Sequence, residues 1–458
     1  MSLAIVIFLA ALAVALAGGR VGLRALVVLA VVLAPLRGGL LELAAELSLS
    51  EPGLTVNAIV PALVAAIAIG CLVRKRPRLG DFPRPLLIGW VVIAVAALLS
   101  YPADVVGLKL YGIGLAQYLV YPTFALAVWP ILEPGDARRL SRLLLALGAV
   151  VAGTALLQAV GVGGFIQAAS AQVEGLAANR YAGVTGSYLH TSAFLGCTAV
   201  LAMGELPSLR SIAARIGGVV LLAMILSGVV LTFSRSGVVI SLIGAGALYL
   251  FALKGVRLRF TVLVVPAAII ALAAGSIGGV SPTATTERVS SGFSPTHDAG
   301  NKLRTESFSH GFGVYGEASL VQQTIGRGIA STGNAQELVE DPAPKVTVES
   351  YYLKLLVETG VVGLLLIGGF LVWAAITFAL SGWKPRSPWT ASVGAAGLGL
   401  SLYNVIYPAL ETQVLALAWW LLLVICLAIK AEPAAAAAPD QPAGAGAAAG
   451  EPAPALSR

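Results

Sequence analysis

The chain has 458 residues, of which 58% are hydrophobic and only 11% are charged. This is too little charge to cover the surface of a water-soluble protein. The composition therefore excludes a soluble protein and predicts one that crosses a membrane several times. The formal net charge of +7 has the sign that nucleic-acid binding requires, but the basic residues are scattered among short loops between apolar runs. We therefore expect them to orient the chain in the membrane, and we expect no nucleic-acid partner.

The apolar runs are each close to the roughly 20 residues that a helix needs to cross about 30 Å of hydrocarbon. Membrane-spanning strands would instead alternate polar and apolar residues. The predicted fold is all-α, a polytopic bundle of about 12–13 transmembrane helices. If the first two runs form a re-entrant pair or a single broken element, the lower number applies and the N-terminus moves to the cytoplasm. The candidate spans are 2–18, 22–36, 54–73, 86–101, 110–132, 140–160, 188–205, 212–233, 236–252, 258–280, 350–378, 388–409 and 412–430.

Basic residues cluster in alternate connections between these spans, which predicts that those connections are cytoplasmic. The clusters occur at 74–78, 138–142, 210–215, 254–259 and 384–386. The segments 161–187, 234–236 and 281–349 then face outward. The basic residues in the short connections on that side run against the topology rule: Arg37, Lys109, Arg180 and Arg235.

The large outward segment is long for a connection in a compact protein, and such segments are commonly functional. Its middle, 301–324, is predicted to be an amphipathic helix. The C-terminal tail is mainly Ala, Pro and Gly, which predicts a disordered cytoplasmic extension without a catalytic role. The predicted regions are N-terminal helices at 1–160, central helices at 161–280, the outward segment at 281–349, C-terminal helices at 350–430 and the tail at 431–458.

A lone carboxylate, Glu349, precedes the longest predicted span. Counted at about 100° per residue, Glu349, Tyr352 and Gly360 lie along one stripe of a continuous helix. Glu358 lies on the opposite face, four residues after Lys354, and these two residues are expected to form an ordinary pair at the membrane surface. Glu349 has no such partner, so it is a candidate functional residue. The alternative is that it only begins the helix, because an acid there suits the positive end of the helix dipole.

Two outward arginines lie in distinctive sequences. Arg235 interrupts the apolar stretch 212–252, within T-F-S-R-S-G, so the chain is expected to turn there at the outer surface. An arginine in the bilayer centre costs about 2.5–3.5 kcal/mol on insertion scales, so Arg235 either reaches water from a turn or serves a function. Arg180 lies in a Gly-rich segment just before a predicted span. His190, near the start of that span, is expected to be a hydrogen-bonded structural residue rather than a base.

Three motifs occur in a fixed order: N-R-Y-A-G-V-T-G at 179–186, T-F-S-R-S-G at 232–237, and G-R-G at 326–328 followed by E-S-Y-Y-L-K-L-L-V-E-T-G-V-V-G-L. Together they resemble the O-antigen ligase and polymerase superfamily of bacterial envelope enzymes. The order, topology and loop lengths are similar over about 180–380. The first five spans are similar only in being apolar.

The resemblance implies glycosyl transfer at the periplasmic face of the bacterial inner membrane. The implied donor is an undecaprenyl-pyrophosphate-linked glycan, and the implied acceptor is a sugar hydroxyl on a lipid-linked repeat unit or on lipid A core. The transfer would invert the sugar and use no metal or other cofactor. Cys71, Cys197 and Cys426 also lack metal-ligand spacing, and no disulfide is expected. Membrane lipids, a flippase and a chain-length regulator are the further partners that the resemblance makes plausible.

The residue chemistry agrees with this implication. Arg180 and Arg235 can bind pyrophosphate oxygens through bidentate, charge-assisted hydrogen bonds and stabilise charge that grows in the transition state. Glu349, partly desolvated at the membrane edge, is the candidate general base. Further candidates for substrate binding are Arg304 for a phosphate or sugar contact, Tyr351 and Tyr352 for the sugar site, and His310, which is also an alternative base.

Glu349 occupies a position that is usually histidine in ligases acting on lipid A core. Glutamate is more similar to the polysaccharide polymerases, so a polymerase is favoured and a ligase is the alternative. A lipid-linked glycan transporter or flippase is an alternative of another class, but such proteins place ionisable residues or broken helices near mid-membrane. Here the charges cluster at the outer ends of spans, which favours surface chemistry. A scaffolding protein would not need the outward segment.

Overall fold

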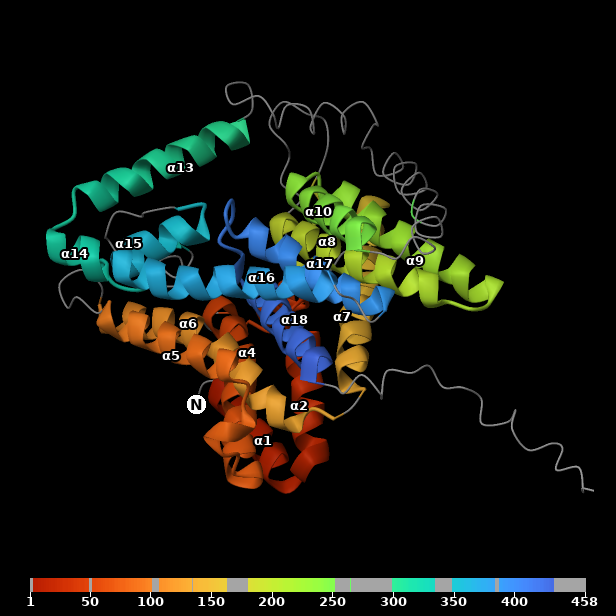
Figure 1. The fold of residues 1–458 in the computed structure, drawn as a ribbon, viewed down its shortest axis with the longest axis horizontal. Helices are drawn as coiled ribbons and strands as arrows, with labels where there is room; N and C mark the ends of the chain where they lie inside the picture. The colour runs from red at the N-terminus through yellow and green to blue at the C-terminus, as the bar shows by residue number, and fades with distance from the viewer. Residues whose placement is uncertain are drawn as a thin grey trace, which may run out of the picture.

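The computed structural model describes residues 3–48, 52–100, 107–133, 135–162, 180–251, 264, 299–333, 348–383 and 387–431. Within these ranges every regular element is a helix, which confirms the all-α, polytopic membrane fold (Figure 1). The N-terminal part contains α1 (Leu3–Ala17), α2 (Gly19–Leu33), α3 (Arg37–Glu46), α4 (Pro52–Lys75), α5 (Arg84–Leu99), α6 (Leu108–Val128) and α7 (Asp136–Ala159). The remainder contains α8 (Tyr188–Glu205), α9 (Ile212–Leu231), α10 (Arg235–Phe251), α13 (Ala299–Gly316), α14 (Leu320–Ile325), α15 (Tyr351–Gly363), the π-helical segment η6 (Leu364–Gly368), α16 (Gly369–Trp383), α17 (Pro388–Tyr403) and α18 (Gln413–Ala431).

A helix occupies the position of each predicted span except 258–280, of which only Val264 lies within the described residues. Among the described residues, seven helical runs are long and apolar enough to cross a membrane, and α1, α5 and most of α10 are shorter apolar helices. The first two predicted spans are separate helices. The broken element comes one helix later, where α2 and α3 meet at an angle of 84°.

Helix α8 lies at the centre of the bundle and packs against α7, α9, α10 and α17. Small residues permit this close packing, because membrane helices approach most closely where side chains are absent. A Cβ atom added to Gly196 of α8 would lie 2.6 Å from the carbonyl oxygen of Gly237 in α10. Helix α8 therefore holds α10 and α17 in fixed positions, and the N-termini of α8 and α10 lie close together.

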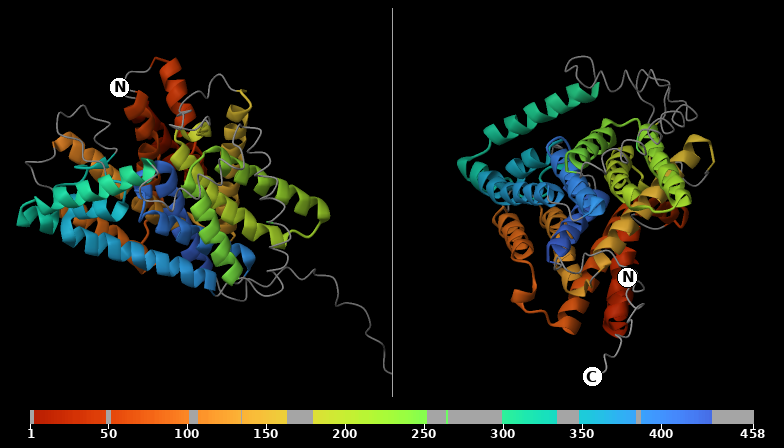
Figure 2. Two further views of the ribbon diagram at one scale, coloured as in Figure 1. Left: turned by 90° about the horizontal axis from the view of Figure 1, so that it is seen from above. Right: turned by 45° about the vertical axis from the view of Figure 1, so that its right-hand side comes forward.

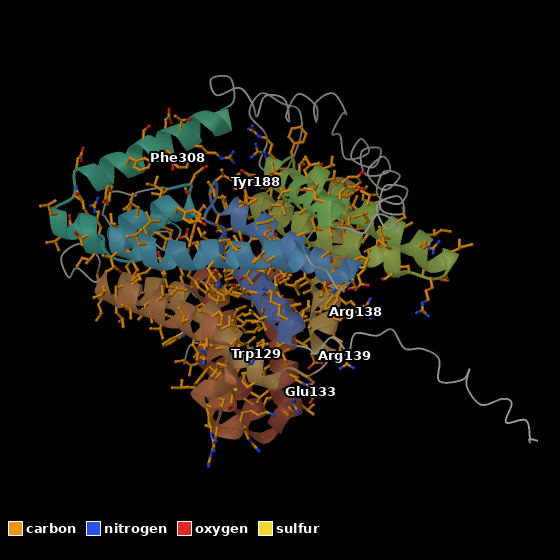
Figure 3. The ribbon with its side chains drawn as sticks, viewed as in Figure 1. Trp129, Glu133, Arg138, Arg139, Tyr188 and Phe308 are labelled. Carbon is orange, nitrogen blue, oxygen red and sulfur yellow. The ribbon has the colours of Figure 1, made fainter. Side chains whose placement is uncertain are left out.

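Glu133, Arg138 and Arg139 lie toward one end of the bundle together with Trp129, while Tyr188 and Phe308 lie toward the other end (Figure 3). At the first end Arg24 pairs with both Glu133, at 2.5 Å, and Asp136, at 2.6 Å. These contacts join the start of α2 to the connection between α6 and α7. The basic cluster at 138–142 therefore shares an end with the start of α2, as the alternation of loops predicts.

In the outward segment, α13 lies beside α15 at the other end of the bundle (Figure 2). The predicted helix at 301–324 is present as two helices, α13 and α14, separated at residues 317–319. Ser319 caps α14 by accepting a hydrogen bond from the backbone N–H of Gln322. This cap starts a new helix and gives the segment a corner, so that α14 packs against α15.

The span predicted at 350–378 is helical but not continuous, because the chain reverses direction at Gly360. Gly360 has φ 64° and ψ −171°, which is not helical. In a straight helix Tyr352 and Gly368 would lie about 24 Å apart along the axis. Instead a Cβ atom added to Gly368 would lie 3.7 Å from the Tyr352 ring. Residues 351–359 thus fold back on the start of the following span, and the predicted stripe does not continue through Gly360.

The G-R-G sequence explains how this reversal is held. The backbone N–H groups of Arg327 and Gly328 donate hydrogen bonds to the carbonyls of Val357 and Glu358, at 3.0 and 3.1 Å. These carbonyls would otherwise be unsatisfied at a helix C-terminus. Gly326 and Gly360 both have positive φ, and a Cβ atom on either would collide with backbone atoms of the other segment. The two glycine motifs therefore form one structural unit.

Candidate active site

Glu349 lies directly before α15 and is held by the outward segment. Its side-chain Oε2 accepts a hydrogen bond from Nε of Arg304 at 3.2 Å, and its backbone N–H donates to Oγ of Ser307 at 2.9 Å. The side chains of Arg304 and Glu349 are 30% and 33% exposed. Because both partners lie on α13, this helix fixes the position of the carboxylate while leaving it accessible.

Arg180 is placed beside an aromatic ring. Its guanidinium carbon lies 4.5 Å from the centre of the Tyr188 ring, a cation–π contact. Its Nε atom is buried and has no hydrogen-bond partner among the described residues. A buried N–H group without a partner is costly, so this guanidinium is suited to an anion that can accept the bond.

Arg235 begins α10, directly after the turn that separates α10 from α9, which confirms the predicted turn in the apolar stretch. Ser192 of α8 holds this turn, because its hydroxyl accepts a hydrogen bond from the N–H of Gly237 at 2.8 Å and donates to the carbonyl of Ser234 at 3.2 Å. The N–H of Tyr181 donates to the carbonyl of Leu231 at 3.2 Å. The segments that carry Arg180 and Arg235 are therefore joined to each other.

Tyr407 lies in the loop after α17, near Glu349 and Tyr188. Burial raises the pKa of its hydroxyl well above the ordinary value, and the nearby Tyr403, Glu411, Glu349 and Tyr188 raise the pKa further. Tyr407 therefore stays protonated at neutral pH and lies within electrostatic range of both Glu349 and Tyr188, the partner of Arg180. Glu349 and Tyr188, the ring partner of Arg180, are thus both close enough to Tyr407 to affect its pKa.

The structure also locates the remaining predicted residues. His190 forms a hydrogen bond with Tyr407 (Nε2 to OH, 3.1 Å), so it is hydrogen-bonded as predicted. Tyr351 is buried, Tyr352 is half-buried beside Gly368, and His310 is exposed on α13. Their predicted contacts with substrate stay predictions.

The interpretation of Lys354 and Glu358 as a surface pair is wrong, because their side chains are only 2% and 0% exposed. Nζ of Lys354 lies 2.6 Å from Oε1 of Glu358 and 3.5 Å from Oε1 of Glu411. Glu358 also accepts hydrogen bonds from the Tyr118 hydroxyl at 2.8 Å and from the Thr332 hydroxyl at 2.7 Å. This buried network joins α6, the segment after α14, α15 and the loop before α18. The reversal at Gly360 buries the pair, and spacing along the sequence does not reveal it.

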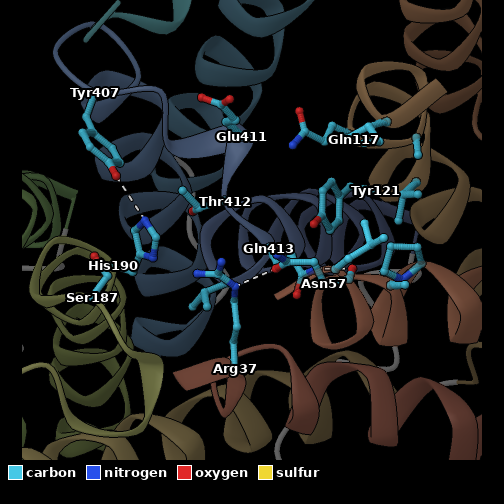
Figure 4. A pocket seen from close by; sticks show the side chains of 17 residues that line it. Arg37, Asn57, Gln117, Tyr121, Ser187, His190, Tyr407, Glu411, Thr412 and Gln413 are labelled. Atoms are coloured by element: carbon cyan, nitrogen blue, oxygen red, sulfur yellow. Dashed lines mark hydrogen bonds between the residues drawn. The ribbon is translucent and has the colours of Figure 1, made fainter. Parts of the chain in front are cut away.

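A cavity of about 410 Å³ lies next to this network (Figure 4). Its lining includes Arg37, Asn57, Gln117, His190 and Glu411. In the sequence, Arg37 stands out only as a basic residue in a connection predicted to face outward. Nothing in the sequence indicates that the amides of Asn57 and Gln117 line a cavity. The cavity is built largely from N-terminal helices, whose sequences carry no motif.

The fold and this polar end together define a polytopic helical membrane protein with a charged site at one end of its bundle. Residues 219–368 match the family model described as O-antigen ligase. These residues, about a third of the chain, are therefore similar to the O-antigen ligase family, in agreement with the resemblance in the motifs. The matched residues include Arg235, Arg304, Glu349 and the reversal at Gly360. No curated protein matches the chain.

Proposed function

We propose that the protein transfers a glycan from an undecaprenyl-pyrophosphate donor to an acceptor sugar hydroxyl at the periplasmic face of the bacterial inner membrane. The observation that carries this proposal is a partly buried carboxylate, Glu349, near Tyr407 and Tyr188, with Arg180 stacked on the Tyr188 ring and bearing a buried N–H that has no partner among the described residues. The match to the O-antigen ligase family supports the same reaction class.

In the proposed reaction Glu349 accepts the proton of the acceptor hydroxyl as its oxygen attacks the anomeric carbon of the donor. A bond forms between that oxygen and the anomeric carbon while the bond to the pyrophosphate oxygen breaks. A single displacement of this kind inverts the sugar. Arg180 and Arg235 stabilise the charge on the departing pyrophosphate, so no metal is required. Arg304 orients the carboxylate through its 3.2 Å hydrogen bond.

The glutamate at position 349 favours a polymerase that joins lipid-linked repeat units. A ligase that transfers the glycan to lipid A core is the second candidate, because the matching family model is described as O-antigen ligase. Purified protein should be supplied with a lipid-pyrophosphate-linked oligosaccharide, with and without lipid A core. A product ladder from the donor alone supports the polymerase, product only with core supports the ligase, and no product in either condition contradicts glycosyl transfer.

The proposed orientation can be tested in intact cells. The cysteines Cys71, Cys197 and Cys426 are buried, so a new cysteine in the outward segment gives a specific signal. The Gly300→Cys variant should react with a membrane-impermeant thiol reagent, and the unmodified chain is its control. Absence of labelling in a well-expressed variant would contradict the periplasmic location of the site.

A further inference from the structure

The cavity of about 410 Å³ lies between α3, α4, α6, the start of α8 and the loop before α18. This volume falls within the range of sites that hold small molecules. Neither Arg180 nor Arg235 lines it, and Glu349 does not line it either. The cavity is therefore distinct from the residues proposed to perform the chemistry.

Uncharged hydrogen-bonding groups dominate the polar part of the wall. Primary amides come from Asn57, Gln117 and Gln413, and phenols come from Tyr121 and Tyr407. Amides and phenols each supply both a donor and an acceptor, which matches the hydroxyl groups of a sugar. The amide of Gln117 forms no hydrogen bond with the described residues, and Figure 4 shows it beside the open space. A ligand hydroxyl in the cavity would satisfy it.

The charges in the wall balance each other. Arg37 donates through Nε to Oδ1 of Asn57 at 2.7 Å. Glu411 is the acidic residue of the lining, and its carboxylate also faces Lys354 at 3.5 Å. One guanidinium opposed by one carboxylate does not make an anion site, so the wall does not suit pyrophosphate. Leu54 and Ile113 add apolar surface, against which the C–H face of a sugar ring can pack.

We propose that this cavity binds a saccharide ring of the glycan substrate, with Gln117 and Asn57 contacting its hydroxyls. This inference rests on the proposed function, since it assigns the sugar part of that substrate to a site. Tyr407 lines the cavity and also lies within electrostatic range of Glu349. Tyr407, which lines the cavity, therefore places the proposed sugar site near the carboxylate.

Saturation-transfer NMR tests the proposal on the full-length protein in lipid nanodiscs. The probes are the methyl glycosides of glucose, galactose, mannose, rhamnose and N-acetylglucosamine, with glycerol as the polyol control. Gln117→Leu removes the free amide, and Ala58→Leu adds bulk to the cavity wall. Gly112→Leu is the matched control, because it adds bulk to α6 at a position with nothing within 4 Å.

We expect saturation transfer to at least one glycoside in the unmodified chain and in Gly112→Leu, and a decrease of at least fivefold in both Gln117→Leu and Ala58→Leu. The absence of transfer to every glycoside, or equal transfer in all variants, would overturn the proposal. The same measurement on Glu349→Gln separates saccharide binding in the cavity from the proposed glycan transfer. Glycoside binding should persist in Glu349→Gln. A separate assay of glycan transfer by this variant tests the proposed chemistry, which predicts that transfer is lost.

Discussion

Lys354 Nζ lies 2.6 Å from Glu358 Oε1 inside the protein, with both side chains at most 2% exposed. The pair has a second carboxylate nearby, that of Glu411. Removing one member of a buried ion pair leaves an uncompensated charge, which is far more destabilising than losing a surface pair. The network therefore makes Lys354 essential to the structure that carries Glu349.

Replacement of Lys354 by methionine should strongly destabilise the protein. The Lys354→Met variant leaves Glu358 and Glu411 without their shared cation, and we expect a loss of about 3–5 kcal/mol, seen as a lower melting temperature in detergent. Lys109→Met is the matched control, because Lys109 is exposed on α6. Similar melting temperatures for the two variants would show that the buried network does not stabilise the fold.

A methyl group at the chain reversal should also destabilise the protein. Gly360 has φ 64°, and its added Cβ atom would collide with the backbone of Thr324. We expect Gly360→Ala to lower the melting temperature and to reduce glycan transfer, since the reversal positions the helix after Glu349. Gly369→Ala provides the comparison, because Gly369 is helical and has nothing within 4 Å. A neutral effect at both glycines would argue against the backbone constraint.

Loss of the Arg180 guanidinium should reduce glycan transfer without unfolding the protein. We expect Arg180→Ala to lower kcat by about 10²–10³-fold, the usual effect of removing a group that stabilises transition-state charge. Arg180→Lys should recover little activity, because a point charge replaces a planar fork. Arg210→Ala, an exposed position at the opposite end, serves as the control. Full activity in Arg180→Ala would remove this residue from the mechanism.

Arg304 should act by orienting Glu349. In Arg304→Ala the carboxylate loses its hydrogen bond to Nε, and a small misplacement of a reacting group can cost about 10²-fold in rate. We expect kcat to fall while KM changes little, and we expect Arg304→Lys to restore part of kcat. A rise in KM with unchanged kcat would instead identify Arg304 as a substrate contact.

The positions of most helices were predictable because a span must be apolar over about 20 residues regardless of its neighbours. The turn before Arg235 was predictable for the same reason, since the apolar stretch is too long for one span. The reversal at Gly360 was not, because it depends on G-R-G residues more than thirty positions earlier in the chain. A glycine in an apolar run is equally compatible with close helix packing.

The candidate site shows the same limit. Glu349, Arg180 and Arg235 were identifiable because each lies in a recognisable motif. The burial of Glu358 depends on Tyr118 and Thr332, which are distant in sequence, so a spacing of four residues indicated a pair but not its environment. The cavity beside Arg37 is formed largely by N-terminal helices, whose apolar sequences carry no motif. The amide residues that line it belong to no motif either.

The assignment of Glu349 as the general base is tested most directly by glycan transfer in purified protein. Glu349→Gln should be compared with Glu317→Gln, an exposed glutamate of the same outward segment, using a lipid-pyrophosphate-linked oligosaccharide. We predict that Glu349→Gln folds normally and forms no transfer product, whereas Glu317→Gln matches the unmodified protein. Product formation by Glu349→Gln at the unmodified rate would contradict the proposed mechanism.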